Sequence, residues 1–375
     1  MPGLLPDLDP DGLLEFSVVF TDRSLNHMSG KFQQVMNDIS ATMKEVYQAD
    51  AIAVVPGGGT YGMEAVARQF ATDQRCLVIR NGWFSFRWTQ IFEMGDIPDE
   101  HVVMQAQRLS DAKDAPFAPA AVDEVCDRIA EMQPAVVFAP HVETASGIML
   151  PDDYIQAVTA ATHEAGGLFV LDCIASGAMW VDMQALGIDV VISAPQKGWS
   201  ASPCSALVML SNHALERMET TTSTSFAADL GKWLQIMAAY ENGGHAYHAT
   251  MPTDSLTQFR DTMLESGQVG FDALRAKQLE LGKKVRELLA NKGIKSVAAP
   301  GFEAPGVVVC YTDQGAIQNG KAFSEVGLQI AAGVPLQCDE GDDYQSFRLG
   351  LFGLEKLKQV DRTVATLSEA LDAVL

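Results

Sequence analysis

The chain has 375 residues, of which 47% are hydrophobic, so it is long and apolar enough to bury a sizeable core. Its formal net charge of −22 argues against nucleic acids and anionic membrane surfaces as partners, because both are bound through basic patches. It has no run of about 18 uncharged apolar residues, and its acidic start, MPGLLPDLDPDGLLEF, lacks the regions of a signal peptide. We therefore expect neither a membrane span nor a secretory leader.

Short apolar runs alternate with helical patterns in the first two thirds of the chain. The run AIAVV is followed by a segment whose apolar residues share one helical face: Met63, Val66, Ala67 and Phe70. The runs CLVIR, VVFAP, LFVL and DVVIS come next, and a helix is predicted between Pro151 and Gly166. Because these runs are continuous rather than alternating, they predict strands buried on both faces, in the mainly parallel sheet of an α/β domain.

The pattern changes near residue 255. The segment MLESGQVGFDALRAKQLELGKKVRELLANKG is charged and helical, GVVVCYT is typical of a strand, and KLKQVDRTVATLSEALDAVL predicts a final amphipathic helix. We predict an N-terminal segment at 1–24, a large α/β domain at 25–255 and a smaller α+β domain at 256–375.

The cysteines and histidines show no spacing typical of a metal site or a disulfide framework. No two cysteines form a CxxC pair, which suits a protein of the reducing cytoplasm; they are Cys76, Cys126, Cys173, Cys204, Cys310 and Cys338. His245 and His248 are three residues apart but lack further ligands, so no metal site is expected.

Polar residues follow each predicted strand. Ligands of open parallel sheets bind beyond the carboxyl ends of the strands. There the sequence places PGGGT after the first strand, NGWF after the second, HVET after the third, Asp172 after the fourth and APQK, ending in Lys197, after the fifth. One edge of the sheet is therefore predicted to gather a glycine loop, aromatic rings, a hydroxyl, a carboxylate and a lysine.

The glycine loop has three interpretations. At the start of a helix, its free N–H groups would bind a phosphate. GGGTYG also matches the dinucleotide fingerprint G-x-G-x-x-G, but that fingerprint needs an acidic residue after the next strand, where Arg80 and Asn81 stand. A nucleotide-dependent oxidoreductase therefore remains an alternative, as does a plain structural turn.

Asp172 and Lys197 are the most informative pair. They could form an internal salt bridge, but burying such a pair is costly. Pyridoxal phosphate would remove that cost, because it needs a lysine for its Schiff base and a carboxylate to keep its pyridine nitrogen protonated. Its phosphate would occupy the glycine loop, and an aromatic ring would cover its own ring. The residues thus favour a pyridoxal phosphate site.

Several motifs resemble those of class V aminotransferases of the alanine–glyoxylate and serine–pyruvate type. HVETASG resembles the family's H-x-E-T/S-x-x-G, LDCIASGAMWVDMQALGIDVVISAPQKGW its D-x-x-x-S to Q-K block, YHATMPTDSL its Y-H-x-T-x-P segment and FRLGLFG its R-x-G-x-x-G segment. The resemblance runs from about residue 25 to the end and implies the fold-type I architecture. The family's G-P-G-P-like start is replaced here by FSVVFTDRSLNHMSGKF.

The resemblance implies a role for each matching residue. Lys197 would carry the Schiff base and Asp172 would pair with the pyridinium nitrogen. Phe84 would stack on the cofactor ring, and Thr144 would lie near the ring hydroxyl. The phosphate would be bound by four residues: Gly58, Gly59, Thr60 and Gln196. Arg348 would bind the substrate's α-carboxylate. Tyr247 and Thr250 would reach the phosphate of a second subunit, so a homodimer with shared active sites is implied.

The implied activity is a pyridoxal-phosphate-dependent transfer of an amino group from a small amino acid to a 2-oxo acid such as glyoxylate or pyruvate. A lyase on the same fold is the main alternative. A desulfurase would need a cysteine in a mobile loop rich in glycine and serine, and no cysteine here has that setting. A non-catalytic scaffold that keeps the fold is the remaining possibility.

Overall fold

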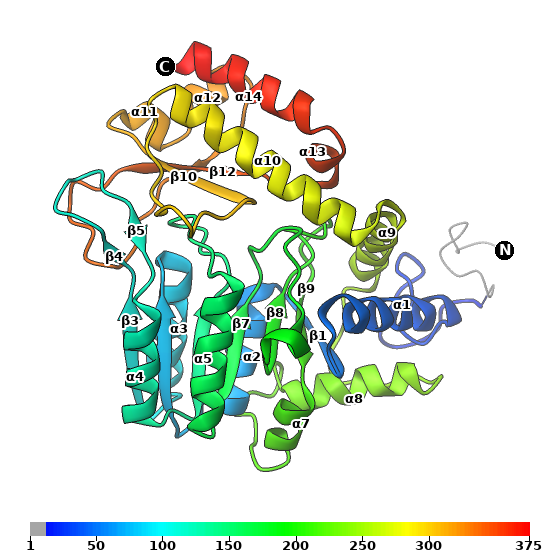
Figure 1. Cartoon of the computed structure of the whole chain (residues 1–375). Helices are drawn as coiled ribbons and strands as arrows, with labels where there is room; N and C mark the ends of the chain where they lie inside the picture. The colour runs from blue at the N-terminus through cyan, green and yellow to red at the C-terminus, as the bar shows by residue number, and fades with distance from the viewer. Residues whose placement is uncertain (1–12) are drawn as a thin grey trace.

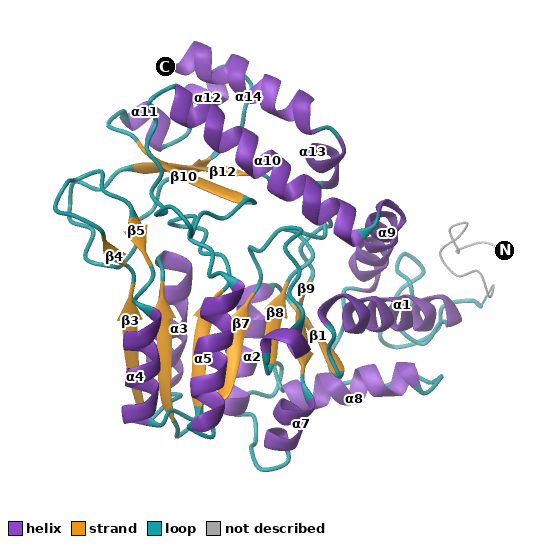
Figure 2. Cartoon of the chain, in the orientation of Figure 1, coloured by secondary structure: helices purple, strands orange, loops and turns teal. Residues whose placement is uncertain are grey.

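The structure is a computed structural model and describes residues 13–375, so the start of the 1–24 segment and most of MPGLLPDLDPDGLLEF lie outside the described residues. Its core element is a seven-stranded sheet in the order β1-β9-β8-β7-β6-β2-β3 (Figures 1 and 2). The strands are β1 Ala51–Pro56, β2 Arg75–Arg80, β3 Glu100–Gln105, β6 Val136–Pro140, β7 Leu168–Asp172, β8 Val190–Ser193 and β9 Ser205–Leu210.

The predicted parallel sheet is confirmed, with one strand reversed. Strands β8, β7, β6, β2 and β3 pair in parallel, whereas β9 pairs antiparallel with both β1 and β8. The central strands are buried along their whole length, as their continuous apolar runs predict. Strand β9 follows the lysine turn directly, and so short a connection cannot make the crossover that a parallel neighbour requires.

Helices cover both faces of this sheet. In Figure 1, α4 and α5 lie on the near face and α2 lies behind it. The helices of this part are α1 Gly30–Tyr47, α2 Gly59–Phe70, α3 Trp83–Gly95, α4 Val122–Met132, α5 Asp152–Glu164, α6 Met183–Leu186, α7 Asn212–Met218 and α8 Leu230–Glu241. Helix α2 begins earlier than its apolar pattern, at the glycine loop, and α5 begins directly after Pro151 as predicted.

The C-terminal part lies beyond the carboxyl-end edge of the sheet (Figure 1). A three-stranded sheet, β10-β12-β11, is covered by long helices. Its elements are β10 Val307–Tyr311, β11 Ala331–Ala332, β12 Ser346–Gly350, α9 Thr253–Val269, α10 Phe271–Asn291, α11 Gly315–Gln318, α12 Lys321–Glu325, α13 Leu354–Lys358 and α14 Val360–Val374. A short hairpin, β4 Gln107–Arg108 and β5 Phe117–Ala118, lies between the two sheets in Figure 2.

Two details differ from the predicted elements. The segment predicted as helical after residue 262 is two helices, because Gly270 has a φ of +95°, a conformation in which glycine avoids the penalty of a side chain. The apolar run LGLFG that follows Arg348 predicts this residue at the start of a strand, whereas Arg348 is the third residue of β12. The domain boundary that we propose at 255/256 falls in the first turn of α9.

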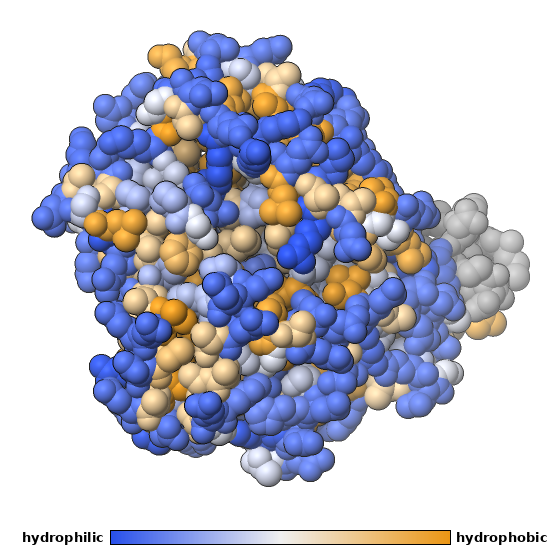
Figure 3. All heavy atoms as spheres, viewed as in Figure 1, coloured by the Kyte–Doolittle hydropathy of each residue, from blue (hydrophilic) through white to orange (hydrophobic). Residues whose placement is uncertain are grey.

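The visible surface is mostly polar, as expected of a chain in which 20% of the residues are charged (Figure 3). The face in Figure 3 is largely hydrophilic, with small hydrophobic patches scattered over it. None of the helices in residues 13–375 combines the length and apolar character needed to cross a lipid bilayer.

Candidate active site

Asp172 and Lys197 lie at the same edge of the large sheet. Asp172 is the last residue of β7 and is 8% exposed, and Lys197 lies in the turn that follows β8. Neither is among the ion pairs found in residues 13–375. The alternative of an internal salt bridge between them is therefore wrong, and both groups are left with capacity for a ligand.

Burial shifts the pKa of both Lys197 and Asp172 toward the uncharged form. It lowers the pKa of Lys197, and the guanidinium groups of Arg348 and Arg87 lower it further, while the Asp172 carboxylate opposes them. Burial also raises the pKa of Asp172 to about 7, although the Ile174 N–H donates a hydrogen bond of 2.9 Å to its Oδ1. An uncharged lysine is a nucleophile and a base, and a buried carboxyl group is stabilised as the anion when a ligand brings a positive charge beside it.

The glycine loop has the geometry of an anion site. Gly57 has a φ of +121°, and a Cβ on Gly59 would lie 2.4 Å from Cδ1 of Ile174, so this turn is built for glycine. Helix α2 begins here, and the N–H groups of Gly58, Gly59 and Thr60 have no hydrogen-bond acceptor within residues 13–375. These free donors at a helix start fit a phosphate.

Gln196 and a cavity border the lysine. The Oε1 of Gln196 is buried and has no hydrogen-bond partner among the described residues. A cavity of about 490 Å³ is lined by Gln196 and Lys197 and also by residues 352–355, which follow β12. The ring of Phe352 lies 5.3 Å from Nζ of Lys197. The free N–H groups of the glycine loop and the unpaired carboxyl of Asp172 together fit pyridoxal phosphate.

Phe84 connects the loop, the sheet edge and the C-terminal part. It is the second residue of α3, and its ring is only partly buried. The guanidinium of Arg87 lies 4.7 Å from the ring centroid, and that of Arg348 lies 5.4 Å from it. Arg87 also donates a hydrogen bond of 3.2 Å to Oγ1 of Thr60. The structure thus brings the predicted stacking, phosphate and carboxylate-binding residues together.

His141 lies beside Asp172 in the loop after β6, and Thr144 follows in the same loop. The backbone N–H of His141 donates a hydrogen bond of 2.9 Å to the backbone carbonyl of Asp172. The ring Nδ1 of His141 lies 2.7 Å from Oγ of Ser176. Burial lowers the pKa of His141 to about 4, so this imidazole is neutral at physiological pH. Thr144 is in the turn two residues past Val142.

Tyr247 and Thr250 are apart from this group. They lie in the segment between α8 and α9, where the two hydroxyls are 3.0 Å apart. Tyr247 is 52% exposed and contacts the ring of His27, at a centroid distance of 5.6 Å. Their position on the surface is compatible with a contact to another subunit.

Arg87 and Glu143 were missed by the sequence analysis. Arg87 is one helical turn after Phe84, so the spacing i to i+3 in NGWFSFR was the available signal. Within the described residues it has no carboxylate partner, although it lies near both Asp172 and Lys197. The signal for Glu143 was its place in HVETASG, where only the threonine received a role.

Glu143 holds the start of α3 in place. Its carboxylate is fully buried and accepts hydrogen bonds from the N–H groups of Phe84, Ser85 and Ala145 at 3.1, 2.9 and 2.9 Å. It also accepts one from Oγ of Ser85 at 2.6 Å. A carboxylate at a helix start is favoured by the helix dipole. Glu143 therefore holds in place the backbone from which the Phe84 side chain projects.

We expect Glu143→Gln to destabilise the protein, because an amide has one acceptor oxygen for four donors and presents its own N–H₂ to the others. The free energy of unfolding should fall by on the order of 3 kcal/mol, the cost of orphaned donors and lost charge-assisted bonds. Chemical denaturation measures this, with the exposed Glu131→Gln as the matched control. Equal stability of the two variants would contradict the positioning role.

The thiols do not support a desulfurase. Five of the six cysteines are buried, Cys126 is partly buried, and all are free. Burial raises the pKa of each of the six thiols, so none is poised as a thiolate.

Comparison with known proteins identifies the family. The family model for class V aminotransferases matches residues 15–334. An alanine–glyoxylate aminotransferase of Rattus norvegicus is 24% identical over 93% of this chain and 82% of its own length. The solved structure of an alanine–glyoxylate aminotransferase from Nostoc sp. superposes with a TM-score of 0.75, at 20% identity, over 92% of this chain and 88% of that chain. The latter shows that the fold is that of fold-type I aminotransferases.

One relative has a different name. The small subunit of a soluble hydrogenase from Synechococcus sp. is 28% identical over 94% of this chain and 87% of its own length. In residues 13–375 the one cluster suited to hold a metal ion, His163, Asp189 and His213, contains no cysteine. These residues therefore offer no thiolate set for an iron–sulfur or related centre, and the hydrogenase name is not carried over.

The match over most of the chain, together with the glycine loop, the unpaired Asp172 and the partly buried Lys197, leads to one assignment. It replaces the alternative of a nucleotide-dependent oxidoreductase. The chain belongs to the class V aminotransferase family and is a pyridoxal-phosphate-dependent aminotransferase.

Proposed function

We propose that this enzyme moves the amino group of a small amino acid to a 2-oxo acid such as glyoxylate or pyruvate. The observation that carries the proposal is Arg348. Its guanidinium lies over the ring of Phe84 and close enough to Lys197 to lower the pKa of the lysine. Within the described residues, Arg348 is in none of the ion pairs and so has no carboxylate partner. A free arginine at this place suits an α-carboxylate. The alanine–glyoxylate relative supports the choice of small substrates.

We assign the remaining roles by position. Lys197 holds the cofactor and, once released by substrate, moves the α-proton. Asp172 faces the pyridine nitrogen, and Phe84 covers the ring. The phosphate is held by the free N–H groups at the start of α2, by the guanidinium of Arg87 and by the side-chain N–H₂ of Gln196. The N–H groups are those of Gly58, Gly59 and Thr60. Thr144 lies near the ring hydroxyl. When bound, the cofactor supplies an electron-withdrawing ring that acidifies the α-C–H bond.

A half-reaction screen tests the substrate class. The purified holoenzyme is mixed with single amino acids, and loss of the absorbance of the lysine-bound cofactor is followed. Small α-amino acids should discharge it, and glyoxylate or pyruvate should restore it. An amine without an α-carboxylate, such as an aminoalkyl phosphonate, is the control. If only that control reacts, the α-carboxylate is not the recognised group and the proposal is wrong.

Arg348→Lys should raise KM for both the amino donor and the 2-oxo acceptor. The arginine Nε donates 2.7 Å to the Ala332 carbonyl, which leaves the terminal nitrogens to grip a carboxylate in a planar fork. Lysine offers a single point charge. We expect the fall in kcat/KM to correspond to a loss of about 2–4 kcal/mol of transition-state stabilisation. Steady-state kinetics with both substrates measures this.

An effect of Arg348→Lys on one substrate alone would mean that the two carboxylates bind at different places. Unchanged kinetics for both would assign Arg348 a structural role. The absorbance spectrum of the resting enzyme should stay the same in either case, which separates substrate binding from cofactor binding.

We also propose a homodimer in which Tyr247 and Thr250 complete the phosphate site of the other subunit. Their exposure and their distance in sequence from the glycine loop support this. Sedimentation should show a dimer. A variant with Tyr247→Ala and Thr250→Ala should be weakly active, and Lys197→Ala inactive. Hybrids of the two should regain activity, because one site in each hybrid has a native lysine and a native tyrosine. No recovery, or a fully active monomer, would contradict shared sites.

Two further proposals concern the context of the chain. The six free cysteines support a reducing compartment such as the cytoplasm. The large and small sheets support the division into a large domain at 25–255 and a smaller one at 256–375.

A further inference from the structure

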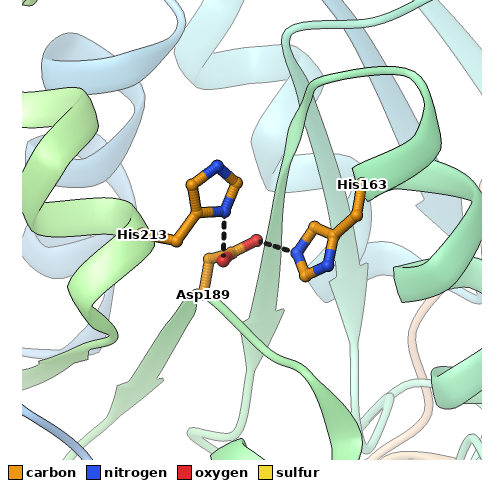
Figure 4. A group of neighbouring side chains, drawn as sticks. All are labelled: His163, Asp189 and His213. Carbon is orange, nitrogen blue, oxygen red and sulfur yellow. Dashed lines mark hydrogen bonds and ion pairs between the residues drawn. The ribbon is translucent and has the colours of Figure 1, made fainter.

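Two histidines and an aspartate meet at the edge of the large sheet opposite the active site (Figure 4). His163 is in the last turn of α5, Asp189 directly precedes β8, and His213 is the second residue of α7. Lys197 follows the carboxyl end of β8, so the strand separates the two places. The aminotransferase mechanism makes no use of this cluster.

The two imidazoles point at one carboxylate from either side (Figure 4). Nε2 of His163 lies 2.9 Å from Oδ2 of Asp189, and Nδ1 of His213 lies 2.8 Å from Oδ1. The three prospective ligand atoms all lie within 4.8 Å of one another. The Asp189 side chain is 1% exposed, whereas those of His163 and His213 are 37% and 42% exposed. The cluster is thus anchored inside and open to solvent at its rim.

We propose that His163, Asp189 and His213 form a binding site for a divalent transition-metal ion, with Zn²⁺ as its most suitable occupant. Two imidazole nitrogens and one carboxylate oxygen are a common protein ligand set for zinc, and water completes the coordination. Ligand atoms on a tetrahedral zinc ion lie about 3.3 Å apart. Binding therefore requires the two N–O distances to open by a few tenths of an ångström. Each ring nitrogen that faces Asp189 must also lose its proton, which a charged histidine releases to water and a neutral histidine carries on its other ring nitrogen instead.

The surroundings hold the carboxylate in position without the histidines. The Phe169 N–H donates 2.7 Å to Oδ2 of Asp189, and Oγ of Ser211 lies 3.3 Å from Oδ1. These bonds orient the carboxylate in the manner of the outer partners of known metal sites. In the metal-free protein, the histidine–carboxylate hydrogen bonds keep the ligand atoms close together. The site is therefore largely formed before the ion arrives.

The ion would act on stability rather than on the reaction. The ion would cross-link three segments at the amino-end edge of the sheet, because its ligands lie in α5, directly before β8 and in α7. An ion that binds the folded chain and not the unfolded chain raises the melting temperature by mass action. The aminotransferase rate, set at the opposite edge, should not depend on the ion.

The test uses tag-free holoenzyme freed of metal by a chelator. Zn²⁺ binding is measured by competition with a chromophoric chelator, Co²⁺ binding by its visible absorption, and the melting temperature with and without Zn²⁺. The variants are His163→Gln and His213→Asn. The amide nitrogen of each new side chain lies near the place of the histidine nitrogen that faces Asp189, Nε2 of His163 or Nδ1 of His213, so it can keep the hydrogen bond. Amides are poor metal ligands, so only metal binding should be lost. The control is His101→Gln, on edge strand β3, whose ring lies 5.6 Å from that of Phe92.

We expect one Zn²⁺ per wild-type chain with micromolar affinity, a higher melting temperature when the ion is bound, and the same for the control. Each ligand variant should bind at least about tenfold more weakly, since changes even in outer partners cost that much. Equal binding by the wild type and both variants, or a wild type without stoichiometric Co²⁺ absorption, would make the cluster a hydrogen-bonded anchor only. Either result would leave the aminotransferase assignment intact.

Discussion

Lys197→Ala should abolish aminotransfer, with kcat reduced by at least about 10⁴-fold, because the variant loses both the covalent anchor and the base that moves the α-proton. Lys197 suits both tasks, because burial and the charges of Arg348 and Arg87 lower its pKa and leave the amine uncharged more often than an exposed lysine. Turnover of the small amino acid found in the half-reaction screen measures the loss. The exposed Lys283→Ala is the matched control and should retain full activity.

A second measurement separates the anchor from a general effect on folding. Borohydride reduction of the wild-type holoenzyme, followed by peptide mapping, should place the pyridoxyl label on Lys197. An added small amine should restore part of the proton transfer in Lys197→Ala, because it can enter the space left by the side chain. A label on another lysine, or an active Lys197→Ala enzyme, would remove Lys197 from the centre of the reaction.

The parts of the fold that the sequence predicted are those with a local signal. Continuous apolar runs such as LFVL and DVVIS are typical of doubly buried strands, and these became β7 and β8. The direction of β9 was not predictable from its own residues, since SALVML would pack equally well in either direction. Strand order is likewise set by packing between distant segments. Glycine at 270 could have indicated the break between α9 and α10, because the long helical pattern otherwise continues through it.

The residues of the two sites likewise divide into those with a local sequence signal and those without one. Asp172 and Lys197 were predicted because each directly follows an apolar strand, and parallel strands end at one edge. The role of Glu143 was not predicted, because some of the N–H groups that donate hydrogen bonds to its carboxylate belong to α3, about 60 residues earlier in the chain. The cluster of His163, Asp189 and His213 has ligand spacings of 24 to 26 residues, which no metal motif of short spacing reveals. Folding alone brings such residues together.

Asp172→Asn should retain the cofactor but lose turnover by about 100–1,000-fold, the cost of removing a preorganised charge from a buried catalytic site. The neutral amide cannot stabilise a protonated pyridine nitrogen, and that proton is what makes the ring an electron sink. Absorbance titration with pyridoxal phosphate and steady-state kinetics measure the two properties separately. Near-normal kcat would show that the pyridine nitrogen faces another group.

The stability of the cofactor-free protein provides an independent test of the same residue. Burial raises the pKa of Asp172 to about 7 in the folded chain, above its ordinary value of 3.8. The folded state then binds the proton more tightly than the unfolded state does. The stability that this gives is fully present below pH 4 and is lost as the pH rises through 7. Asp172→Asn has no such proton, so the cofactor-free wild type should lose stability relative to the variant across this range, by a few kcal/mol at most.

Bound cofactor should reverse this difference in stability. A pyridinium beside Asp172 favours the carboxylate, so its pKa falls and the wild type no longer loses stability between pH 4 and 7. Melting temperatures of both proteins at pH 5 and pH 8, with and without pyridoxal phosphate, give the four comparisons. At pH 8 the cofactor should stabilise the wild type more than Asp172→Asn. Equal stabilisation of the two would place the charge of the ring away from Asp172, whatever the kinetics show.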